Sequence, residues 1–168
     1  MGVYKIDTTL FGEIEVPIKD GLFETFTITL GDKEMCTMLY IGEEFLDDET
    51  LCITENFIEH IPEMYNKART TLFACCHENK LVSYFIDSGL EETDRDYLID
   101  AFGVDSVSDI TREEFIDKLS VRCIRIGPDK ENKIDCVFDF SLEEEYTDEL
   151  LVVFFDDAYT ITDISHES

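Results

Sequence analysis

The chain has few basic side chains and no tryptophan. Its 168 residues include 13 Lys and Arg against 40 Asp and Glu, so the formal net charge is −27 at pH 7. Such a surface repels phosphate groups, which argues against the binding of nucleic acid or of an anionic membrane. It favours a basic protein or a cation as the partner, although the same charge also serves solubility.

The motifs of several enzyme classes are missing as well. The eight glycines are scattered and form neither of the glycine-rich sequences that hold nucleotide phosphates. The serine-hydrolase elbow G-x-S-x-G, the zinc-protease motif H-E-x-x-H, the redox motif C-x-x-C and the EF-hand calcium loop are also absent. The sequence therefore predicts no catalytic, cofactor-binding or metal-ligating residue and no cofactor. It favours a protein that is not an enzyme.

Long apolar runs are lacking too. No stretch approaches the roughly 20 apolar residues that a membrane-spanning helix needs, and residues 1–10 lack the apolar run of a secretory signal. We therefore expect a cytoplasmic protein, in which the six cysteines are free, buried thiols that act as small hydrophobic side chains. Apolar residues make up 44% of the chain and no linker interrupts it, so residues 1–168 are expected to form a single domain.

The first fifty residues show the alternation of β-strands. Apolar and polar side chains alternate over residues 13–19, and apolar residues alternate with threonines over residues 25–30. Gly31-Asp32 then predicts a tight turn, after which residues 35–41 run back as the second strand of a hairpin.

The apolar period changes to that of an α-helix at Thr54. A stripe at helical spacing runs from there to Cys76 and includes Phe73. Pro62 interrupts this stripe, because proline removes one helical hydrogen bond and clashes with the preceding turn. Either the helix is kinked there, or a helix starts near Ile61 with Pro62 in its first turn.

Three shorter helices are predicted after this stripe. One covers residues 79–87 and is closed by Gly89, and the next covers residues 94–102 and is ended by Gly103. Thr111-Arg112-Glu113-Glu114 is a capping box, in which the Thr and Glu side chains satisfy each other's exposed backbone amides. A third helix should begin there.

The last third of the chain returns to strands. The strand pattern covers residues 121–126, 134–140, 150–155 and 160–164, with a Gly-Pro-Asp turn at residues 127–129. The loops are short, which favours antiparallel pairing. We therefore predict an α+β fold, in which N-terminal and C-terminal strands form an antiparallel sheet and the central helices pack on it.

Two groups of cysteines are candidate sites. Cys75-Cys76-His77 contains adjacent metal-binding side chains, but neighbouring helical positions point about 100° apart and no second Cys/His pair lies nearby. We interpret it as a helix end with core thiols. Cys123 and Cys136 fall in strands of one predicted hairpin and could sit side by side on one face, where core packing is expected in place of a disulfide.

Acidic pairs and histidines are the remaining candidates for functional residues. With 40 acids in 168 residues, carboxylate pairs arise by chance and identify no general acid and base, so a solvated surface is expected for them. His60, His77 and His166 have no nucleophile at a recognisable spacing. The acidic pairs and runs are Glu43-Glu44, Asp47-Asp48-Glu49, Glu91-Glu92, Glu143-Glu144-Glu145 and Asp156-Asp157.

Four segments carry a resemblance to a known family. They read LFGEI at residues 10–14, TREEF at 111–115, EEYTDELLVVFFD at 144–156 and ITDISHES at 161–168. Together they resemble the bacterial family known as domain of unknown function two-thousand-and-four. The resemblance implies a bacterial, acidic, single-domain α+β protein and offers no catalytic residues to carry over. Where this chain has Asp157-Ala158-Tyr159, the family's turn more often carries a glycine.

Three functions remain open on the sequence. The first is a non-catalytic protein-binding module that neutralises a basic partner, as toxin-immunity proteins do, and its cue is the charge. The second is an enzyme whose site is assembled only in three dimensions, which requires a cleft with His60 or His77 beside carboxylates of perturbed pKa. The third is a structural subunit of a homo-oligomer, which requires a large exposed apolar patch near the Phe-rich strands.

Overall fold

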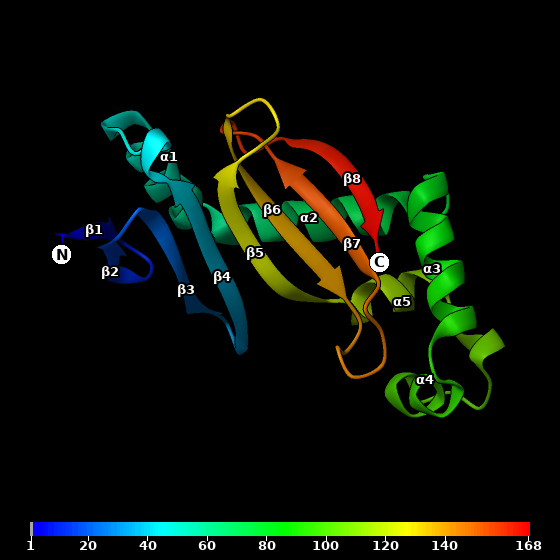
Figure 1. The fold of residues 1–168 in the computed structure, drawn as a ribbon. Coiled ribbons are helices and arrows are strands. Elements are labelled where there is room, and N and C mark those ends of the chain that lie inside the picture. Colours follow the sequence, from blue (N-terminus) through cyan, green and yellow to red (C-terminus); the bar gives the residue numbers. More distant parts are fainter. Residues whose placement is uncertain (1) are drawn as a thin grey trace.

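A computed structural model describes residues 2–168, which contain one eight-stranded sheet (Figure 1). The strands lie across the sheet in chain order, from β1 at one edge to β8 at the other. Their bounds are Gly2–Thr8 (β1), Gly12–Ile18 (β2), Gly21–Leu30 (β3), Lys33–Gly42 (β4), Ser120–Pro128 (β5), Ile134–Ser141 (β6), Leu150–Phe155 (β7) and Ile161–Glu167 (β8). Neighbours are antiparallel except β4 and β5, which are parallel. A parallel pair needs a long crossover connection, and the helical segment provides it.

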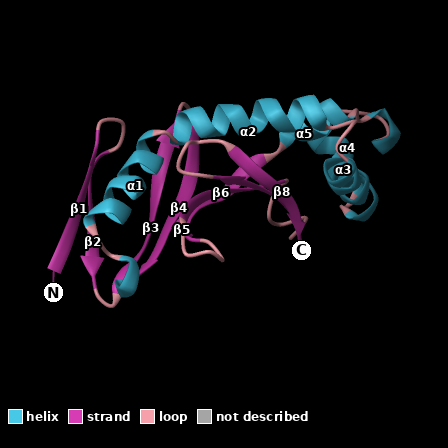
Figure 2. Ribbon diagram, turned by 90° about the horizontal axis from the view of Figure 1, so that it is seen from above, coloured by secondary structure: helices cyan, strands magenta, loops and turns pink. Residues whose placement is uncertain are grey.

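The helices all lie between β4 and β5 in the described chain. They are α1 (Asp48–Glu59), α2 (Ile61–Cys75), α3 (Lys80–Glu92), α4 (Arg95–Phe102) and α5 (Arg112–Lys118), with short 3₁₀ helices at Glu43–Phe45 and Val107–Asp109. Figure 2 shows α1 and α2 along one face of the sheet, with α3, α4 and α5 gathered near β8. No helix within residues 2–168 is both long and apolar enough to cross a membrane.

The core lies between the sheet and this helical layer. Because side chains of a strand alternate between faces, every second strand residue points toward the helices. The arrangement confirms the predicted α+β fold, with one parallel junction inside an otherwise antiparallel sheet. Fully or almost fully buried members of the core include Ile6, Val16, Leu39, Ile41, Phe57, Ile61, Ala68, Leu72, Ile124, Ile126, Phe138 and Phe140.

Two local predictions about turns and helix starts are confirmed by backbone geometry. Gly31-Asp32 forms the two-residue turn between Leu30 and Lys33, and Gly31 has a φ of 66°, which glycine adopts without steric cost. Pro62 lies in the first turn of α2, which begins at Ile61. Of the two alternatives for Pro62, a new helix start is therefore the correct one.

The capping box is confirmed as well. The Thr111 hydroxyl accepts the backbone N–H of Glu114 at 3.2 Å, and the Glu114 carboxylate accepts that of Thr111 at 2.8 Å. α4 ends at Gly103, which takes the left-handed conformation with a φ of 64°. The start of α5 and the end of α4 could both be predicted from the sequence, because a cap involves residues only three or four positions apart.

Two expectations about where helices begin and end are wrong. The β-structure does not fill the first fifty residues, because α1 begins at Asp48, with Asp47 as its N-cap, well before Thr54. α3 does not close at Gly89 but continues to Glu92. A Cβ atom at Gly89 would lie 2.5 Å from the Phe115 ring, so this glycine allows α3 and α5 to pack closely.

Phe73 does not belong to the buried stripe. It is 50% exposed, whereas Leu72 is buried, and the two point about 100° apart on α2. The turn between β5 and β6 is also displaced from the predicted Gly-Pro-Asp position. β5 continues to Pro128, which pairs with Ile134, so the turn begins at Asp129.

Cys123 and Cys136 do not sit side by side on one face, as the predicted hairpin would have allowed. The register of β5 and β6 places Cys136 opposite Ile126 and Cys123 opposite Asp139. Cys136 belongs to the core, while the Cys123 sulfur lies 3.8 Å from that of Cys36 on the neighbouring strand β4. A partner on a parallel strand was not visible in the sequence, because the whole helical segment separates the two cysteines.

Candidate functional site

An acidic cleft lies at one end of the sheet, where three segments converge. Its volume is about 660 Å³, and it is formed by the start of α1, the β5–β6 turn and the β7–β8 turn. Figure 1 shows the yellow β5–β6 turn and the orange β7–β8 turn together at this end. The packing of α1 on the sheet brings its first turn to the same place. The cleft is thus a product of tertiary structure.

Seven carboxylates and one ammonium group line this acidic cleft. The ammonium belongs to Lys133, whose Nζ lies 3.0 Å from the Glu131 carboxylate. Two of the acidic runs in the sequence, at residues 47–49 and 156–157, therefore meet in one place. A concave site lined by one sign of charge attracts the opposite sign, so the cleft favours a cation. The carboxylates are those of Asp47, Glu49, Asp129, Glu131, Asp135, Asp156 and Asp157.

Three of these carboxylates stabilise local structure by hydrogen bonds. Asp47 caps α1 by accepting the Thr50 backbone N–H at 2.8 Å. Asp129 accepts the Lys133 backbone N–H at 2.9 Å within the β5–β6 turn. Asp156 accepts two backbone N–H groups in the β7–β8 turn. Aspartate at caps and turns is ordinary chemistry, so these positions are explained without any ligand.

Asp135 has no such explanation. It is the second residue of β6 and pairs with Gly127, over which the Tyr40 ring lies so closely that a Cβ would contact it. Its Oδ1 atom is buried and has no hydrogen-bond partner among the described residues. Burial, followed by the nearby Asp129 carboxylate, raises the pKa of Asp135 to about 6. A partly buried carboxylate with one unpaired oxygen is therefore among the residues that line a cleft that attracts cations.

Replacing Asp135 with asparagine should change how stability depends on pH. The folded-state pKa of about 6 lies above the ordinary value of 3.8, so the folded protein binds more protons between these values and loses stability as pH rises through them. At pH 7.5 the D135N variant should be more stable than wild type by about 1 kcal/mol, after allowance for solvent screening. Near pH 4 the two should be equally stable.

Urea denaturation across this pH range measures the difference. The matched control is D157N, because Asp157 lines the same cleft but is exposed. Because its side chain is exposed, this substitution should change the free energy of unfolding by less than about 0.5 kcal/mol. A constant difference between D135N and wild type from pH 4 to pH 7.5 would contradict the assignment of a raised pKa to Asp135.

A second hollow, of about 620 Å³, lies on the helix-free face of the sheet and also includes Asp135. The Arg125 guanidinium lines it and binds the Asp139 carboxylate through two hydrogen bonds of 2.9 and 3.1 Å. Such a paired geometry is the strongest form of ion pair available to these side chains. The pair joins the neighbouring strands β5 and β6. The Asp139 carboxylate is buried, and the Arg125 guanidinium already balances its negative charge.

The histidines lie apart from both hollows. His60 stacks on Tyr159 with ring centroids 4.0 Å apart, and its Nδ1 lies 2.7 Å from the Asn56 carbonyl. Tyr159 has a φ of 57°, in the left-handed region that is uncommon for residues other than glycine. His166 pairs with Glu149. Neither His60 nor His77 lines either hollow, so the cleft required for the enzyme hypothesis does not contain them.

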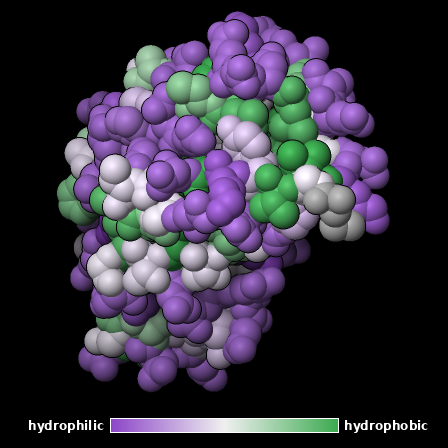
Figure 3. Space-filling model, turned by 90° about the vertical axis from the view of Figure 1, so that its left-hand side faces the viewer, coloured by the Kyte–Doolittle hydropathy of each residue, from purple (hydrophilic) through white to green (hydrophobic). Residues whose placement is uncertain are grey.

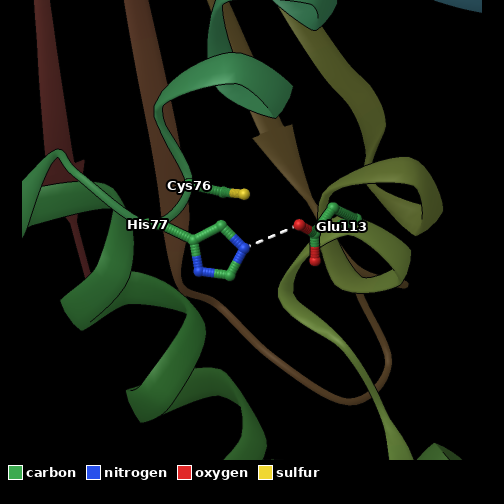
Figure 4. A group of neighbouring side chains, drawn as sticks. All are labelled: Cys76, His77 and Glu113. Atoms are coloured by element: carbon green, nitrogen blue, oxygen red, sulfur yellow. Dashed lines mark hydrogen bonds and ion pairs between the residues drawn. The ribbon is translucent and has the colours of Figure 1, made fainter.

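One group of described residues has ligand atoms close enough to hold a metal ion. The Cys76 sulfur, a ring nitrogen of His77 and a carboxylate oxygen of Glu113 all lie within 4.8 Å of one another (Figure 4). The sequence pointed to Cys75 as well, but only Cys76 faces this group. The expectation that the six thiols are buried is wrong for most of them, because only Cys76 and Cys136 are buried and Cys52 on α1 is exposed. Glu113 was missed because α5 supplies it from a distant part of the chain.

Comparison with known proteins adds no function to this geometry. No known protein family, no curated protein and no solved structure matches the chain. The resemblance to domain of unknown function two-thousand-and-four therefore stays a prediction that rests on the four sequence segments.

Proposed function

We propose that this protein is a non-catalytic binding module that neutralises a basic protein, and that a Lys or Arg side chain of the partner enters the acidic cleft. The observation that supports this most is the buried, unpaired Oδ1 atom of Asp135 in a cleft with seven carboxylates and one lysine. A cation bound in the cleft would lie near a carboxylate whose Oδ1 atom has no hydrogen-bond partner in residues 2–168.

Energetics favour a cationic side chain as the occupant. A buried carboxylate without a partner costs free energy, and the cost is recovered when an opposite charge binds within hydrogen-bond distance. The net charge of −27 also steers a basic partner toward the molecule and raises the association rate. Nucleic acids and anionic lipids carry the wrong sign for both effects.

The cellular setting belongs to the same proposal. Six free cysteines suit a reducing cytosol, and the family resemblance implies a bacterial one. A partner with a positively charged functional surface would lose access to its own ligand when this module binds it. Inhibition by masking requires no catalytic residue, in keeping with a cleft from which all three histidines are absent.

The proposal is tested by binding of a fluorescein-labelled oligo-arginine peptide, followed by fluorescence anisotropy at low and at raised salt. The variant E49Q/D157N removes two exposed charges of the acidic cleft that have no capping or turn hydrogen bond in residues 2–168. It should weaken binding roughly fivefold or more, because each lost ion pair contributes up to about 1 kcal/mol. Raised salt should weaken the wild-type complex and reduce the difference in peptide affinity between wild type and E49Q/D157N.

The matched control is E91Q/E92Q. It removes the same number of charges from exposed positions at the end of α3, which do not line the cleft. If both double variants weaken binding equally, the peptide responds only to net charge and the cleft is not the binding site. A peptide that fails to bind wild type at low salt would count against the whole proposal.

Exposed apolar side chains favour one alternative, a structural subunit that pairs with a second copy of the chain. Val3, Ile18 and Phe23 are 53%, 37% and 59% exposed on β1, β2 and β3. Figure 3 views the molecule from this side and shows hydrophobic side chains between hydrophilic ones. Because β1 is an edge strand, its free backbone groups could also pair with another strand. Sedimentation of wild type and of a Phe23→Glu variant distinguishes this alternative from a monomer.

A further inference from the structure

We propose that Cys76, His77 and Glu113 form a zinc-binding site, separate from the acidic cleft. The site would take a Zn²⁺ ion through the Cys76 sulfur, the Nε2 atom of His77 and one oxygen of Glu113. Its three ligands come from the end of α2, the turn that follows it and the first turn of α5.

Local folding places each ligand in turn. α2 ends at Cys75, so Cys76 is its C-cap and the chain leaves the helix there. The Ser83 hydroxyl donates to the Cys76 carbonyl at 3.0 Å, which fixes the turn between α2 and α3. The capping box at Thr111 and Glu114 sets the start of α5, and this start directs Glu113 toward the turn. Figure 4 shows the Cys76 sulfur and the His77 ring both facing the Glu113 carboxylate.

The donor set matches the chemistry of zinc. A thiolate, an imidazole nitrogen and a carboxylate oxygen are the three ligand types that Zn²⁺ accepts, whereas Mg²⁺ and Ca²⁺ prefer oxygen alone. Three protein ligands leave the fourth tetrahedral position for water or another small ligand. On binding, the thiol releases its proton to solvent and a sulfur–zinc bond forms.

The geometry requires only a small movement of exposed side chains. The Nε2 atom of His77 now lies 2.6 Å from an oxygen of Glu113, closer than two ligands of one zinc ion, which stand roughly 3.3 Å or more apart at ordinary bond lengths. The side chains of His77 and Glu113 are 60% and 39% exposed, so they can separate to admit the ion. Cys76 is 1% exposed and stays in place as the anchor.

Binding of Zn²⁺ and Co²⁺ to the full-length chain tests this proposal. The metal-free protein is titrated with Zn²⁺ against a coloured chelator, in excess Mg²⁺ to occupy sites made of carboxylates alone. Co²⁺ is then added as a spectroscopic substitute, because a thiolate ligand gives a near-ultraviolet charge-transfer band. We expect one tightly bound ion per chain and a band that is lost in C76S.

Variants of the ligands test whether Cys76, His77 and Glu113 bind the Zn²⁺ ion. H77A and E113Q should each weaken Zn²⁺ binding at least about tenfold, because each removes one of three ligands. These residues are exposed enough that both variants should fold, so the test does not depend on C76S alone. The matched controls are H60A and C52S, which remove a histidine and an exposed cysteine elsewhere. Equal affinity in H77A, E113Q and wild type, or an absent thiolate band, would overturn the proposal.

Discussion

Replacing Phe138 with alanine should lower the free energy of unfolding by about 4 kcal/mol. Phe138 is fully buried at the centre of β6, and its ring centroid lies 5.5 Å from that of Phe155 and 6.2 Å from that of Phe140. The loss combines the transfer free energy of a phenyl ring with the cavity that a rigid sheet cannot fill. Urea denaturation monitored by far-ultraviolet circular dichroism measures it.

Phe73 offers a matched control on the same chain. It has the same side chain but is 50% exposed on α2, so F73A should change the free energy of unfolding by less than about 0.5 kcal/mol. The pair separates burial from residue type. Similar losses in F138A and F73A would mean that the outward orientation of Phe73 is wrong and that the helical stripe includes it after all.

Replacing Arg125 with leucine should destabilise the fold by roughly 3 kcal/mol, because it leaves the Asp139 carboxylate buried without a partner. The side chain of Asp139 is 8% exposed and that of Arg125 is 31% exposed, so water can partly replace the guanidinium and the effect should stay near the lower end for buried pairs. The free energy of unfolding at pH 7 is the quantity to measure.

A double variant distinguishes an orphaned charge from lost packing. In R125L/D139L neither charge remains, so much of the stability lost in R125L should return. If the double variant is as unstable as R125L or more so, the aliphatic part of Arg125 matters through its packing and the ion pair contributes little. The comparison also shows whether the helix-free face of the sheet depends on this pair for its structure.

The acidic cleft and the proposed zinc site can be tested independently. The cleft is formed by the β5–β6 and β7–β8 turns and the start of α1, whereas the zinc ligands lie at the end of α2 and the start of α5. They share no residue. Variants of Glu113 should therefore leave peptide binding unchanged, and variants of Asp157 should leave zinc affinity unchanged, so failure of one proposal does not affect the other.

The sequence predicted those features that short-range interactions decide. The hairpin turn at Gly31-Asp32, the helix start at Pro62 and the capping box at Thr111 each involve residues within four positions of one another. Their geometry is set by local sterics and by side-chain hydrogen bonds to nearby backbone amides. The alternation of the strands could also be predicted, because successive side chains of a strand point to opposite faces and only one face must be apolar to pack in the core.

Predictions failed where a distant residue decides the outcome. Gly89 is typical of a helix end, but the contact with the Phe115 ring explains it as a close approach inside α3. Cys123 lies beside Cys36 and not beside Cys136, because the parallel pairing of β4 with β5 follows a long helical crossover. Neither Phe115 nor Cys36 is near its partner in the chain, so local patterns carried no signal for them.

The sequence by itself determined the charge, the α+β class and the caps and turns that begin and end several elements. Only the tertiary structure decided that residues 47–49 and 156–157 meet around Asp135, and that Glu113 joins Cys76 and His77. The physical reason is that strand order, register and the packing of the helical crossover bring together groups that lie tens of residues apart. Charge and periodicity are properties of the chain, whereas a site is a property of which segments become neighbours.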